Sequence, residues 1–382
     1  MNKSILGPLL FSPKKCYKSG SANLFSPIPI PFLSLCRYFD AKPNVDCKKS
    51  KLYSEKNISR LDDALDFYNK LVRRNPLPCV QEFNKLLSHI VKLKEYSFVI
   101  SRFKDMCFLG IPVDEYTLNI VINAYCNCNK LDYGFSKLGC FFKRGLEPNG
   151  ATFSTLLKAL FKQNRVLEAQ ELFTKIETES LCELNVVVYG VTIDGLCKAG
   201  NTSRAFEIFR EMERKSCMPN VWIYTAIING LCNDRSVDYA VRLFYEMLKK
   251  GVVPNVIAYN SLIHGLCNSS KLKEAKVLMK EMTNWKIYPD NITYNVLIDA
   301  LCKEGLVSEA EDVVLKMKEK NWGPDLVTYN ALVNGYCLQN RVDEARKVFD
   351  SITPDIFSYN ILINGYCKMD KIEEALHLFR IL

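Results

Sequence analysis

The chain is built on a period of 35 residues. Residues 257–267 (IAYNSLIHGLC), 292–302 (ITYNVLIDALC) and 327–337 (VTYNALVNGYC) are copies of one segment, and each copy begins 35 residues after the one before. Prolines return at the same interval, at positions 219, 254, 289 and 324, and an Asn or Asp follows each of them. A unit this short cannot bury an apolar face alone, so the period predicts units that stack into an array.

One unit, residues 326–355, shows the secondary structure that the period encodes. Its first part, from Leu326 to about Leu338, has apolar residues at helical spacing, and Asn340 interrupts the pattern. Its second part, from Val342 onward, has apolar residues on one face and charged residues on the other. The Pro-Asp pair that follows prevents the second helix from continuing. The sequence therefore predicts an all-α fold, an α-solenoid of about nine helix-turn-helix repeats.

Three apolar landmarks recur in the units and are predicted to form the core. An aromatic residue opens most first helices, a small residue lies in the second helix, and a methionine lies near the end of several second helices. The aromatic residues are Phe83, Phe153, Tyr189, Tyr224, Tyr259, Tyr294, Tyr329 and Tyr359. The small residues are Ala169, Ala205, Ala240, Ala275, Ala310, Ala345 and Ala375, and the methionines are Met212, Met247, Met282 and Met317.

Counting from these landmarks predicts five segments. They are an organelle transit peptide at 1–39, a polar linker at 40–60, a degenerate leading half-repeat at 61–79, eight repeats at 80–355, and an incomplete ninth repeat at 356–382. The ninth unit ends before its second helix is complete, which leaves open a truncated protein without function, a partial sequence, or an end covered by a partner. The eight repeats begin at residues 80, 115, 150, 186, 221, 256, 291 and 326.

The net charge of +9 belongs to the N-terminal segment. Residues 1–60 hold eleven Lys or Arg against three Asp or Glu, a net +8, so the repeated body carries only +1. The first 39 residues have no acid and are rich in Ser and Lys, which is typical of a transit peptide, with a disordered tail as the alternative. Prolines 27, 29 and 31 break the longest apolar stretch, so no membrane span is expected there. The segment CRYFDA at 36–41 is similar to plant mitochondrial processing sites, which points to the mitochondrion, whereas the single arginine of the segment keeps the chloroplast as the alternative.

The sixteen cysteines do not indicate a disulfide framework. Seven of them occupy one place in the unit, so stacking would hold them a full repeat apart, too far for a bridge. A buried free cysteine acts as a small apolar side chain, and no Cys-x-x-Cys pair marks a zinc site. We expect packed thiols in a reducing compartment, with no metal and no cofactor. The seven are Cys126, Cys197, Cys232, Cys267, Cys302, Cys337 and Cys367.

The repeated body contains no catalytic motif. There is no Gly-rich phosphate loop, and the three histidines, His89, His264 and His377, are too scattered for a Ser-His-Asp arrangement. The H-x-E with C-x-x-C signature of a zinc deaminase is missing. The sequence therefore predicts that the chain is not an enzyme and has no catalytic residues.

The phrases VTYNALVNGYC, NRVDEARKVF and the closing PD resemble the pentatricopeptide repeat, and the resemblance covers roughly residues 61–382. The units are similar to the P class of that family, and the GLC and GYC triplets resemble plant restorer-of-fertility-like members, which act on mitochondrial transcripts. A tetratricopeptide array is the competing family, but its Trp and Leu-Gly landmarks are missing. The resemblance implies a right-handed superhelix that binds single-stranded RNA, roughly one base per repeat.

The fifth residue of the unit is polar in eight of nine copies although apolar residues surround it. Proteins that read one base per helical repeat need short polar side chains at an equivalent place in every unit. Asn, Ser and Thr are unfavourable inside helices, so their recurrence needs a reason. Helix capping is the alternative reason, since the position is near the first turn. The nine residues are Asn84, Asn119, Ser154, Gly190, Thr225, Asn260, Asn295, Asn330 and Asn360.

The resemblance implies that this fifth residue and the last residue of the unit together select a base. Asn with Asp implies uracil, Asn with Asn a pyrimidine, and Ser or Thr with Asn adenine, whereas Gly190 leaves its unit permissive. The implied site is 5′-U-(C/U)-A-N-A-U-U-U-3′, with the chain parallel to the RNA. The pairs are Asn84 with Asp114, Asn119 with Asn149, Ser154 with Asn185, Gly190 with Asn220, Thr225 with Asn255, Asn260 with Asp290, Asn295 with Asp325, and Asn330 with Asp355.

Two further sets of residues are implied to contact RNA. The second residue of the unit would sandwich bases, with an inter-repeat contact as the alternative, and a lysine after the cysteine position would meet a phosphate, with a solvated surface lysine as the alternative. The sandwiching residues are Tyr116, Val187, Trp222, Ile257, Ile292, Val327 and Phe357. The lysines are Lys162, Lys198, Lys303 and Lys368.

The leading hypothesis is therefore a noncatalytic, sequence-selective binder of single-stranded organellar RNA. It would affect transcript processing, stability or translation by occupying the RNA. The alternative is a protein-interaction scaffold, as in tetratricopeptide solenoids, with organelle proteins as partners.

Overall fold

The structure, a computed structural model, describes residues 60–320 and 322–381. The predicted transit peptide and all of the predicted linker except Arg60 lie outside the described residues. Within the described ranges the chain forms nineteen helices and no strand, as the all-α prediction requires. The chain divides into two compact units, Met1–Ala199 and Gly200–Leu382, and each is described by itself.

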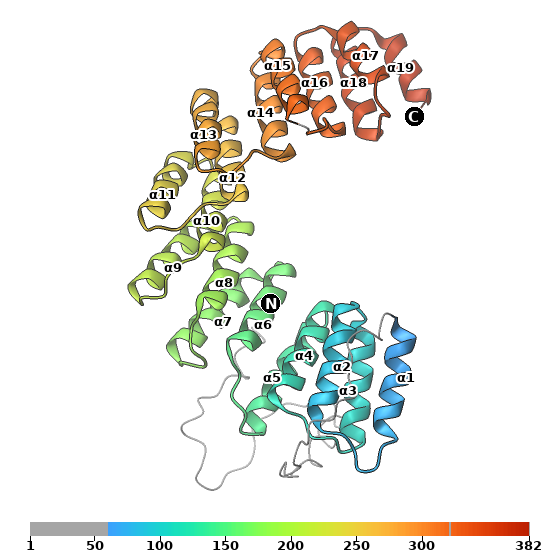
Figure 1. The fold of residues 1–382 in the computed structure, drawn as a ribbon, viewed down its shortest axis with the longest axis vertical. Coiled ribbons are helices and arrows are strands. Elements are labelled where there is room, and N and C mark those ends of the chain that lie inside the picture. Colours follow the sequence, from blue (N-terminus) through green and yellow to red (C-terminus); the bar gives the residue numbers. More distant parts are fainter. Residues whose placement is uncertain (1–59, 321, 382) are drawn as a thin grey trace, which may run out of the picture. The chain divides into compact units, whose positions relative to one another are not determined.

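The first unit holds helices α1 to α8 (Figure 1). Even-numbered helices from α2 onward are the first helices of the predicted repeats, and each begins at the first residue of a predicted repeat. Odd-numbered helices from α3 onward are the second helices. The bounds are α1 Leu61–Val72, α2 Val80–Lys92, α3 Tyr96–Phe108, α4 Glu115–Asn127, α5 Leu131–Lys143, α6 Gly150–Lys162, α7 Val166–Thr178 and α8 Val186–Lys198.

The second unit holds helices α9 to α19, and the same alternation continues (Figure 1). The bounds are α9 Thr202–Arg214, α10 Val221–Asn233, α11 Val237–Lys249, α12 Val256–Asn268, α13 Leu272–Asn284, α14 Asn291–Lys303, α15 Val307–Glu319, α16 Leu326–Leu338, α17 Val342–Asp350, α18 Ile356–Lys368 and α19 Ile372–Ile381.

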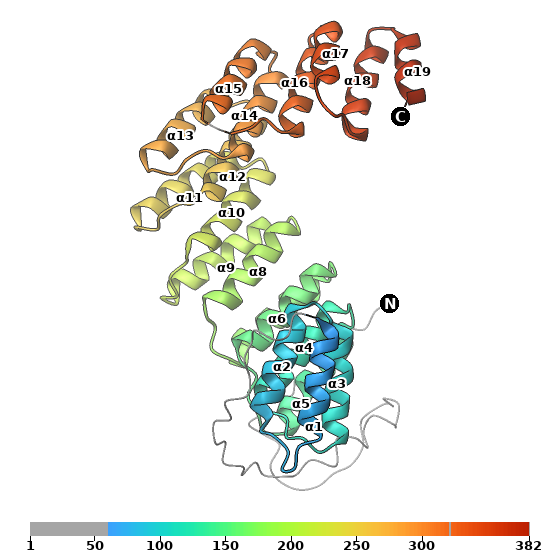
Figure 2. The same ribbon diagram turned by 45° about the vertical axis from the view of Figure 1, so that its right-hand side comes forward.

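Within each unit the first helices form a continuous layer. Helix α4 contacts both α2 and α6, which Figures 1 and 2 show side by side, and α12 contacts α10 and α14 in the same way. Within each unit, each first helix whose own second helix lies in the same unit also packs on that helix. The predicted RNA contacts all belong to the first helices or to the residues that lead into them.

A residue with left-handed backbone conformation connects the two helices of most repeats. Asn340 has φ of 60° and Gly305 has φ of 77°, each between a first helix and its partner. Asn and Gly tolerate this conformation better than other residues, so a sharp turn forms without strain. The predicted break at Asn340 is therefore confirmed.

Aromatic pairs join consecutive repeats in the core. The rings of Phe209 and Tyr224 lie 5.2 Å apart and those of Phe244 and Tyr259 lie 5.0 Å apart, both edge to face. Each pair links a second helix to the next first helix, and such pairs contribute about 0.5–1.5 kcal/mol beyond the apolar area that they bury. The recurring alanines and methionines of the second helices are also buried, which confirms them as core residues.

Glycines in the first helices make room for the cysteines of the preceding repeat. A Cβ added at Gly335 would lie 2.6 Å from Sγ of Cys302, and Gly265 and Gly365 face Cys232 and Cys337 in the same way. All described cysteines are free, and most of the seven recurring ones are buried. Cys367 on α18 is exposed, so the prediction of core packing was wrong for it.

Candidate nucleic-acid interface

Large apolar side chains are exposed at the second position of the first helices. Their exposed fractions run from 41% at Trp222 to 64% at Phe357. Flat or branched apolar faces spaced one per repeat can stack on successive bases, and their exposure leaves them open to do so. The sandwiching role itself stays a prediction. The set comprises the predicted residues Tyr116, Val187, Trp222, Ile257, Ile292, Val327 and Phe357.

The last residue of each repeat is the N-cap of the next first helix. In every one of the eight cases its side-chain oxygen accepts a hydrogen bond from the backbone N–H three residues later. Such a cap contributes about 1 kcal/mol to stability. These Asp and Asn side chains therefore have a structural role besides the predicted one. The caps are Asp114, Asn149, Asn185, Asn220, Asn255, Asp290, Asp325 and Asp355.

The fifth residues lie inside the first helices, so capping is the wrong explanation for them. Asn260 and Asn330 are the fifth residues of α12 and α16, and Asp325, not Asn330, caps α16. Asn84, Asn260 and Asn330 are buried, with 3%, 9% and 7% of their surface exposed. A base would reach these amides from the side of the half-buried or exposed cap residues.

Three of the predicted uracil pairs are joined by the same hydrogen bonds. The amide nitrogen of Asn84 donates to Asp114 at 2.9 Å, that of Asn260 to Asp290 at 3.1 Å, and that of Asn295 to Asp325 at 3.1 Å. A threonine three residues after the Asp completes each group. Its hydroxyl lies 2.7, 2.6 and 2.6 Å from the Asn Oδ1 in turn, and the residues are Thr117, Thr293 and Thr328.

The fourth uracil pair lacks one of these bonds. Ser358 takes the place of the threonine, and its hydroxyl donates to Asp355 at 2.8 Å. No hydrogen bond reaches Oδ1 of Asn330, which is buried without a partner. A buried carbonyl oxygen left unpaired lowers stability, so this site differs from the other three in its local hydrogen bonding.

The remaining fifth residues are held in other ways. Asn119 accepts from the hydroxyl of Thr152 at 2.6 Å, but its cap partner is Asn149 and carries no carboxylate. Ser154 and Thr225 donate to the backbone carbonyls of Ala151 and Val221 in their own helices, at 3.1 and 2.7 Å. Gly190 is buried in α8, and Asn360 is exposed on α18.

Three of the cap carboxylates, those of Asp290, Asp325 and Asp355, are held ionised. Partial burial alone raises the pKa of Asp290, but hydrogen bonds from the Thr293 N–H, the Asn260 amide and the Thr293 hydroxyl outweigh it and hold that pKa below its usual range. Asp325 has a lowered pKa for the same reasons, and the Ser358 N–H is the main cause at Asp355. At neutral pH these side chains are therefore acceptors only.

The four predicted phosphate lysines fall into two groups. Lys198 pairs with Asp194 at 2.7 Å and Lys303 with Asp299 at 2.6 Å, each across one helical turn. Exposed pairs of this kind are weak, about 0–1 kcal/mol, so a phosphate can displace the carboxylate. The structure assigns no ion pair to Lys162 or Lys368, and both the phosphate role and its alternative stay predictions.

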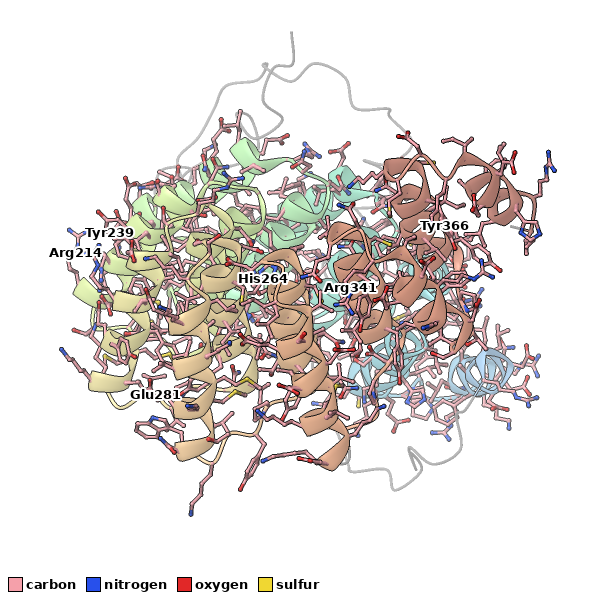
Figure 3. All side chains as sticks on the ribbon, turned by 90° about the horizontal axis from the view of Figure 1, so that it is seen from above. Arg214, Tyr239, His264, Glu281, Arg341 and Tyr366 are labelled. Carbon is pink, nitrogen blue, oxygen red and sulfur yellow. The ribbon has the colours of Figure 1, made fainter. Side chains whose placement is uncertain are left out.

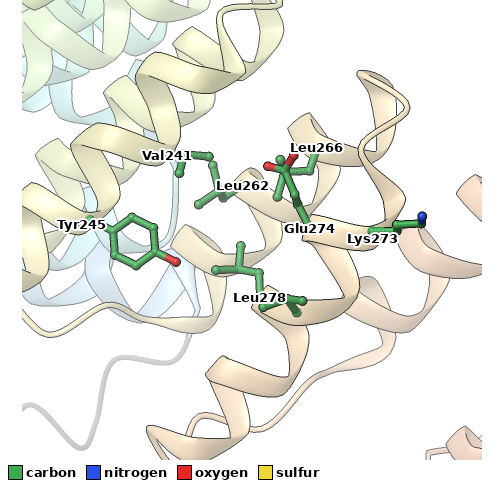
Figure 4. Close-up of a pocket in the computed structure, with 8 residues that line it drawn as sticks. Val241, Tyr245, Leu262, Leu266, Lys273, Glu274 and Leu278 are labelled. Carbon is green, nitrogen blue, oxygen red and sulfur yellow. The ribbon is translucent and has the colours of Figure 1, made fainter.

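The described region also contains an apolar pocket apart from the predicted base-reading pairs. A pocket of about 260 Å³ lies between α11, α12 and α13, lined mainly by aliphatic side chains and Tyr245 (Figure 4). His264, labelled in Figure 3, is exposed on α12, as expected of a surface histidine. Among residues 60–320 and 322–381 no group of three or more His, Cys, Asp or Glu could hold a metal, and no helix there has the length and apolarity to cross a bilayer.

Profiles of known protein families match the repeated part of the chain. Profiles described as the PPR repeat family match residues 184–233, 219–268, 254–303 and 292–337. Profiles described as PPR repeat match residues 144–177, 322–353 and 350–381, and 116–146. The chain belongs to the pentatricopeptide repeat family. The matches reach from residue 116 to residue 381, except for residues 178–183.

Curated pentatricopeptide repeat proteins of Arabidopsis thaliana resemble segments of the chain. One whose name places it in the mitochondrion is 36% identical over 155 residues, which is 40% of this chain and 26% of the relative. Another mitochondrial one is 52% identical over 69 residues, 18% of this chain and 13% of the relative. The matched part of the chain thus spans about a quarter or less of the length of these relatives.

A solved pentatricopeptide repeat structure shares the fold. The crystal structure of PPR10 in complex with an 18-nt psaJ RNA element superposes with a TM-score of 0.54 at 21% identity, covering 86% of this chain and 58% of that one. A cysteine-substituted form of the same complex matches equally well. At this identity the likeness establishes the helical-repeat fold alone.

Reasoning from the sequence missed two residues of the pentatricopeptide unit. One is the third residue of the following repeat, whose threonine hydroxyl contacts the predicted base-reading pair. The other is the glycine of the GLC and GYC triplets, which packs against the preceding cysteine. Comparing residues of one unit with residues of the next unit, and not only residues at equivalent positions, could have identified both.

Proposed function

We propose that this chain is a sequence-selective binder of single-stranded RNA that acts without catalysis, with roughly one base per repeat. The observation that supports it most is the recurrent Asn–Asp pair beside an exposed apolar residue, as in Asn260, Asp290 and Ile257. An amide offers both a donor and an acceptor to a base edge, and apolar faces on either side can hold the base. PPR10, which shares the fold, was crystallised in complex with an RNA element.

The pairs assign the proposed target as 5′-U-(C/U)-A-N-A-U-U-U-3′. The three bonded Asn–Asp pairs, with Asn84, Asn260 and Asn295, take the first, sixth and seventh bases, and Asn330 with Asp355 takes the eighth. Ser154 with Asn185 and Thr225 with Asn255 take adenines. Gly190 with Asn220 accepts any base, since Gly has no side chain to discriminate.

The proposed location is the mitochondrion, with the chloroplast as the alternative organelle. Six relatives carry the word mitochondrial in their names, and the Ser-rich, basic N-terminal segment fits import. There the bound chain would shield a transcript from nucleases or remodel it, and so alter its processing, stability or translation.

The proposed absence of catalysis is supported by the state of the thiols. Burial raises the pKa of the Cys126, Cys232 and Cys302 thiols to about 12, so they are neutral and poor nucleophiles at physiological pH. Neutral, buried thiols fit a packing role and not attack on a phosphodiester.

The proposal is tested by selection of the full chain against a randomised single-stranded RNA pool, repeated over a series of salt concentrations. Enrichment of RNAs with uracil at the first, sixth, seventh and eighth positions is the expected result. Phosphate contacts weaken as the salt concentration rises, whereas contacts to bases set the sequence preference. An affinity that falls with salt while the base preference persists would therefore distinguish the two kinds of contact. A pool that returns no sequence preference would overturn the proposal.

Binding of organelle proteins is the second candidate function. The pocket between α11, α12 and α13, whose lining includes the exposed Val277, offers an apolar surface that the second helices α11 and α13 help to form. Recovery of one protein partner, together with no enrichment from the RNA pool, would favour this scaffold.

A further inference from the structure

The third residue of each repeat differs in kind according to the fifth residue of the repeat before it. Where the fifth residue is Asn, that third residue of the next repeat has a hydroxyl in all five cases. Where the fifth residue is Ser, Gly or Thr, it is Val, Ile or Ala. The hydroxyl residues are Thr117, Thr152, Thr293, Thr328 and Ser358, and the apolar ones are Val188, Ile223 and Ala258.

We propose that this threonine is a positioning residue, which orients the asparagine amide of the preceding repeat for uracil. The inference rests on the proposed function and deepens it. The threonine does not itself touch the base, since Thr117, Thr293 and Thr328 are fully buried. It acts through the asparagine that does.

The hydrogen bonds of one site show how the orientation is fixed. An ionised carboxylate only accepts, so the amide nitrogen of Asn260 must face Asp290, at 3.1 Å. The amide oxygen then faces Thr293, whose hydroxyl proton is shared between this oxygen at 2.6 Å and the Asp290 carboxylate at 2.9 Å. The Thr293 N–H meanwhile donates to Asp290 at 2.9 Å, so one residue holds both members of the pair.

A fixed amide discriminates between pyrimidines. The bonds to Asp290 and Thr293 use one N–H and one lone pair of Asn260, and leave one donor and one acceptor at known places. Uracil presents an N–H beside carbonyl oxygens, whereas cytosine presents an amino group beside a ring-nitrogen acceptor. A flipped amide exchanges donor and acceptor and so loses the match to uracil.

The exceptions agree with this role. Ser154 and Thr225 bond to their own helix backbone and need no outside group to orient them, and the apolar Val188 and Ala258 follow their caps. Ser358 lacks the methyl group that restricts the rotamer of threonine. Its hydroxyl bonds to Asp355, as the threonine hydroxyls do to their own Asp, but it does not reach Oδ1 of Asn330, which is left unpaired.

The first test measures base preference with the full chain and RNAs that carry U or C at the sixth position. Thr293→Val should lower the preference for U over C by about tenfold, the loss of roughly one hydrogen bond, and leave the seventh position unchanged. The matched control is Thr192→Val, since Thr192 is equally buried but bonds only to the Val188 carbonyl at 2.9 Å. A Thr293→Val chain with the parental ratio would overturn the proposal.

A second readout needs no RNA. In chains with 15N-labelled asparagine, the side-chain N–H signals of Asn260, assigned by their loss in Asn260→Ser, should exchange slowly in the parent and fast in Thr293→Val. Equal exchange would refute the orienting role. If the parent shows no base preference at all, the proposed function fails, and with it the link to uracil, while this exchange measurement still decides whether Thr293 orients the amide.

A gain of function provides the converse test. Thr225→Asn with Asn255→Asp creates a uracil pair whose following residue is Ala258. Adding Ala258→Thr should raise the preference for U over C at the fifth position by about tenfold over the double variant, by the same hydrogen bond. No gain from the added hydroxyl, in a chain that remains folded by circular dichroism, would count against the proposal.

Discussion

Gly335 on α16 lies directly against the side chain of Cys302 on α14, with no room for a Cβ between them. A methyl group at Gly335 would approach both Sγ and Cβ of Cys302, at 2.6 and 2.7 Å. The contact crosses from one first helix to the next, in the layer that carries the predicted RNA contacts. It explains why a residue that disfavours helices recurs in the middle of them.

Gly335→Ala should therefore destabilise the solenoid. Overpacking costs about 1–3 kcal/mol, which exceeds the roughly 1 kcal/mol that alanine gains over glycine in a helix. The midpoint of thermal unfolding should fall. Gly139→Ala on α5 is the matched control, since an added Cβ there meets nothing within 4 Å, and it should raise the midpoint. A rise in both variants would contradict the packing role, and Cys302→Ala should recover part of the loss.

Asn330→Thr combined with Asp355→Asn should recode the eighth position. The new pair matches Thr225 with Asn255, which is assigned to adenine, so the preferred base should move from uracil to adenine. Selection from an RNA pool randomised at that position measures the change. The seventh base, read by Asn295 with Asp325, is the internal control and should stay uracil. An unchanged eighth base would refute the assignment of this pair.

Phe357→Ala should weaken RNA binding with little effect on stability. Phe357 is 64% exposed, so its removal costs little core packing, while loss of a stacking face costs about 1–3 kcal/mol of affinity. Equilibrium binding to the proposed target measures the loss. Tyr239→Ala is the control, because Tyr239 is 61% exposed but lies on the second helix α11. Equal losses in both variants would argue against a base-stacking row on the first helices.

Acid should destabilise the second unit through Glu246. Two hydrogen bonds from Arg210, at 2.6 and 2.8 Å, are the main cause that lowers the pKa of Glu246 to about 2 from 4.5. A lowered pKa contributes stability that is complete above pH 4.5 and is lost as the pH falls toward 2. Both side chains are about a third exposed, so solvent screening limits the contribution to about 1 kcal/mol.

Thermal midpoints at pH 5 and pH 2 test this contribution. Arg210→Ala should show a smaller drop between the two than the parent. Arg204→Ala should behave as the parent, because Arg204 pairs only with Glu207 in its own helix. If Arg210→Ala loses as much as the parent on acidification, another group dominates the acid sensitivity.

The helices could be predicted from the sequence because the same apolar pattern recurs in every repeat, so an unclear pattern in one repeat is resolved by the others. The landmark prolines and the apolar spacing located α16 from Leu326 to Leu338, which the structure reproduces. The sequence could not reveal that Asp325 caps α16 while Asn330 does not, because both lie near the first turn and both are polar. Nor could it show the bond from Thr293 to Asn260, since these residues lie 33 positions apart and meet only after two helices have folded.

The hydroxyl bridges place the proposed Asn–Asp uracil sites that have them across a repeat boundary. Asn260 and Asp290 belong to one repeat, but Thr293 is supplied by the next. In a gene that gains and loses repeats by recombination, a crossover at the cap residue separates a base-reading pair from its orienting threonine. The segment that keeps the pair and its threonine together is 35 residues long and begins three residues after the start of a repeat. Junctions in engineered arrays should therefore be placed three residues after the start of a repeat.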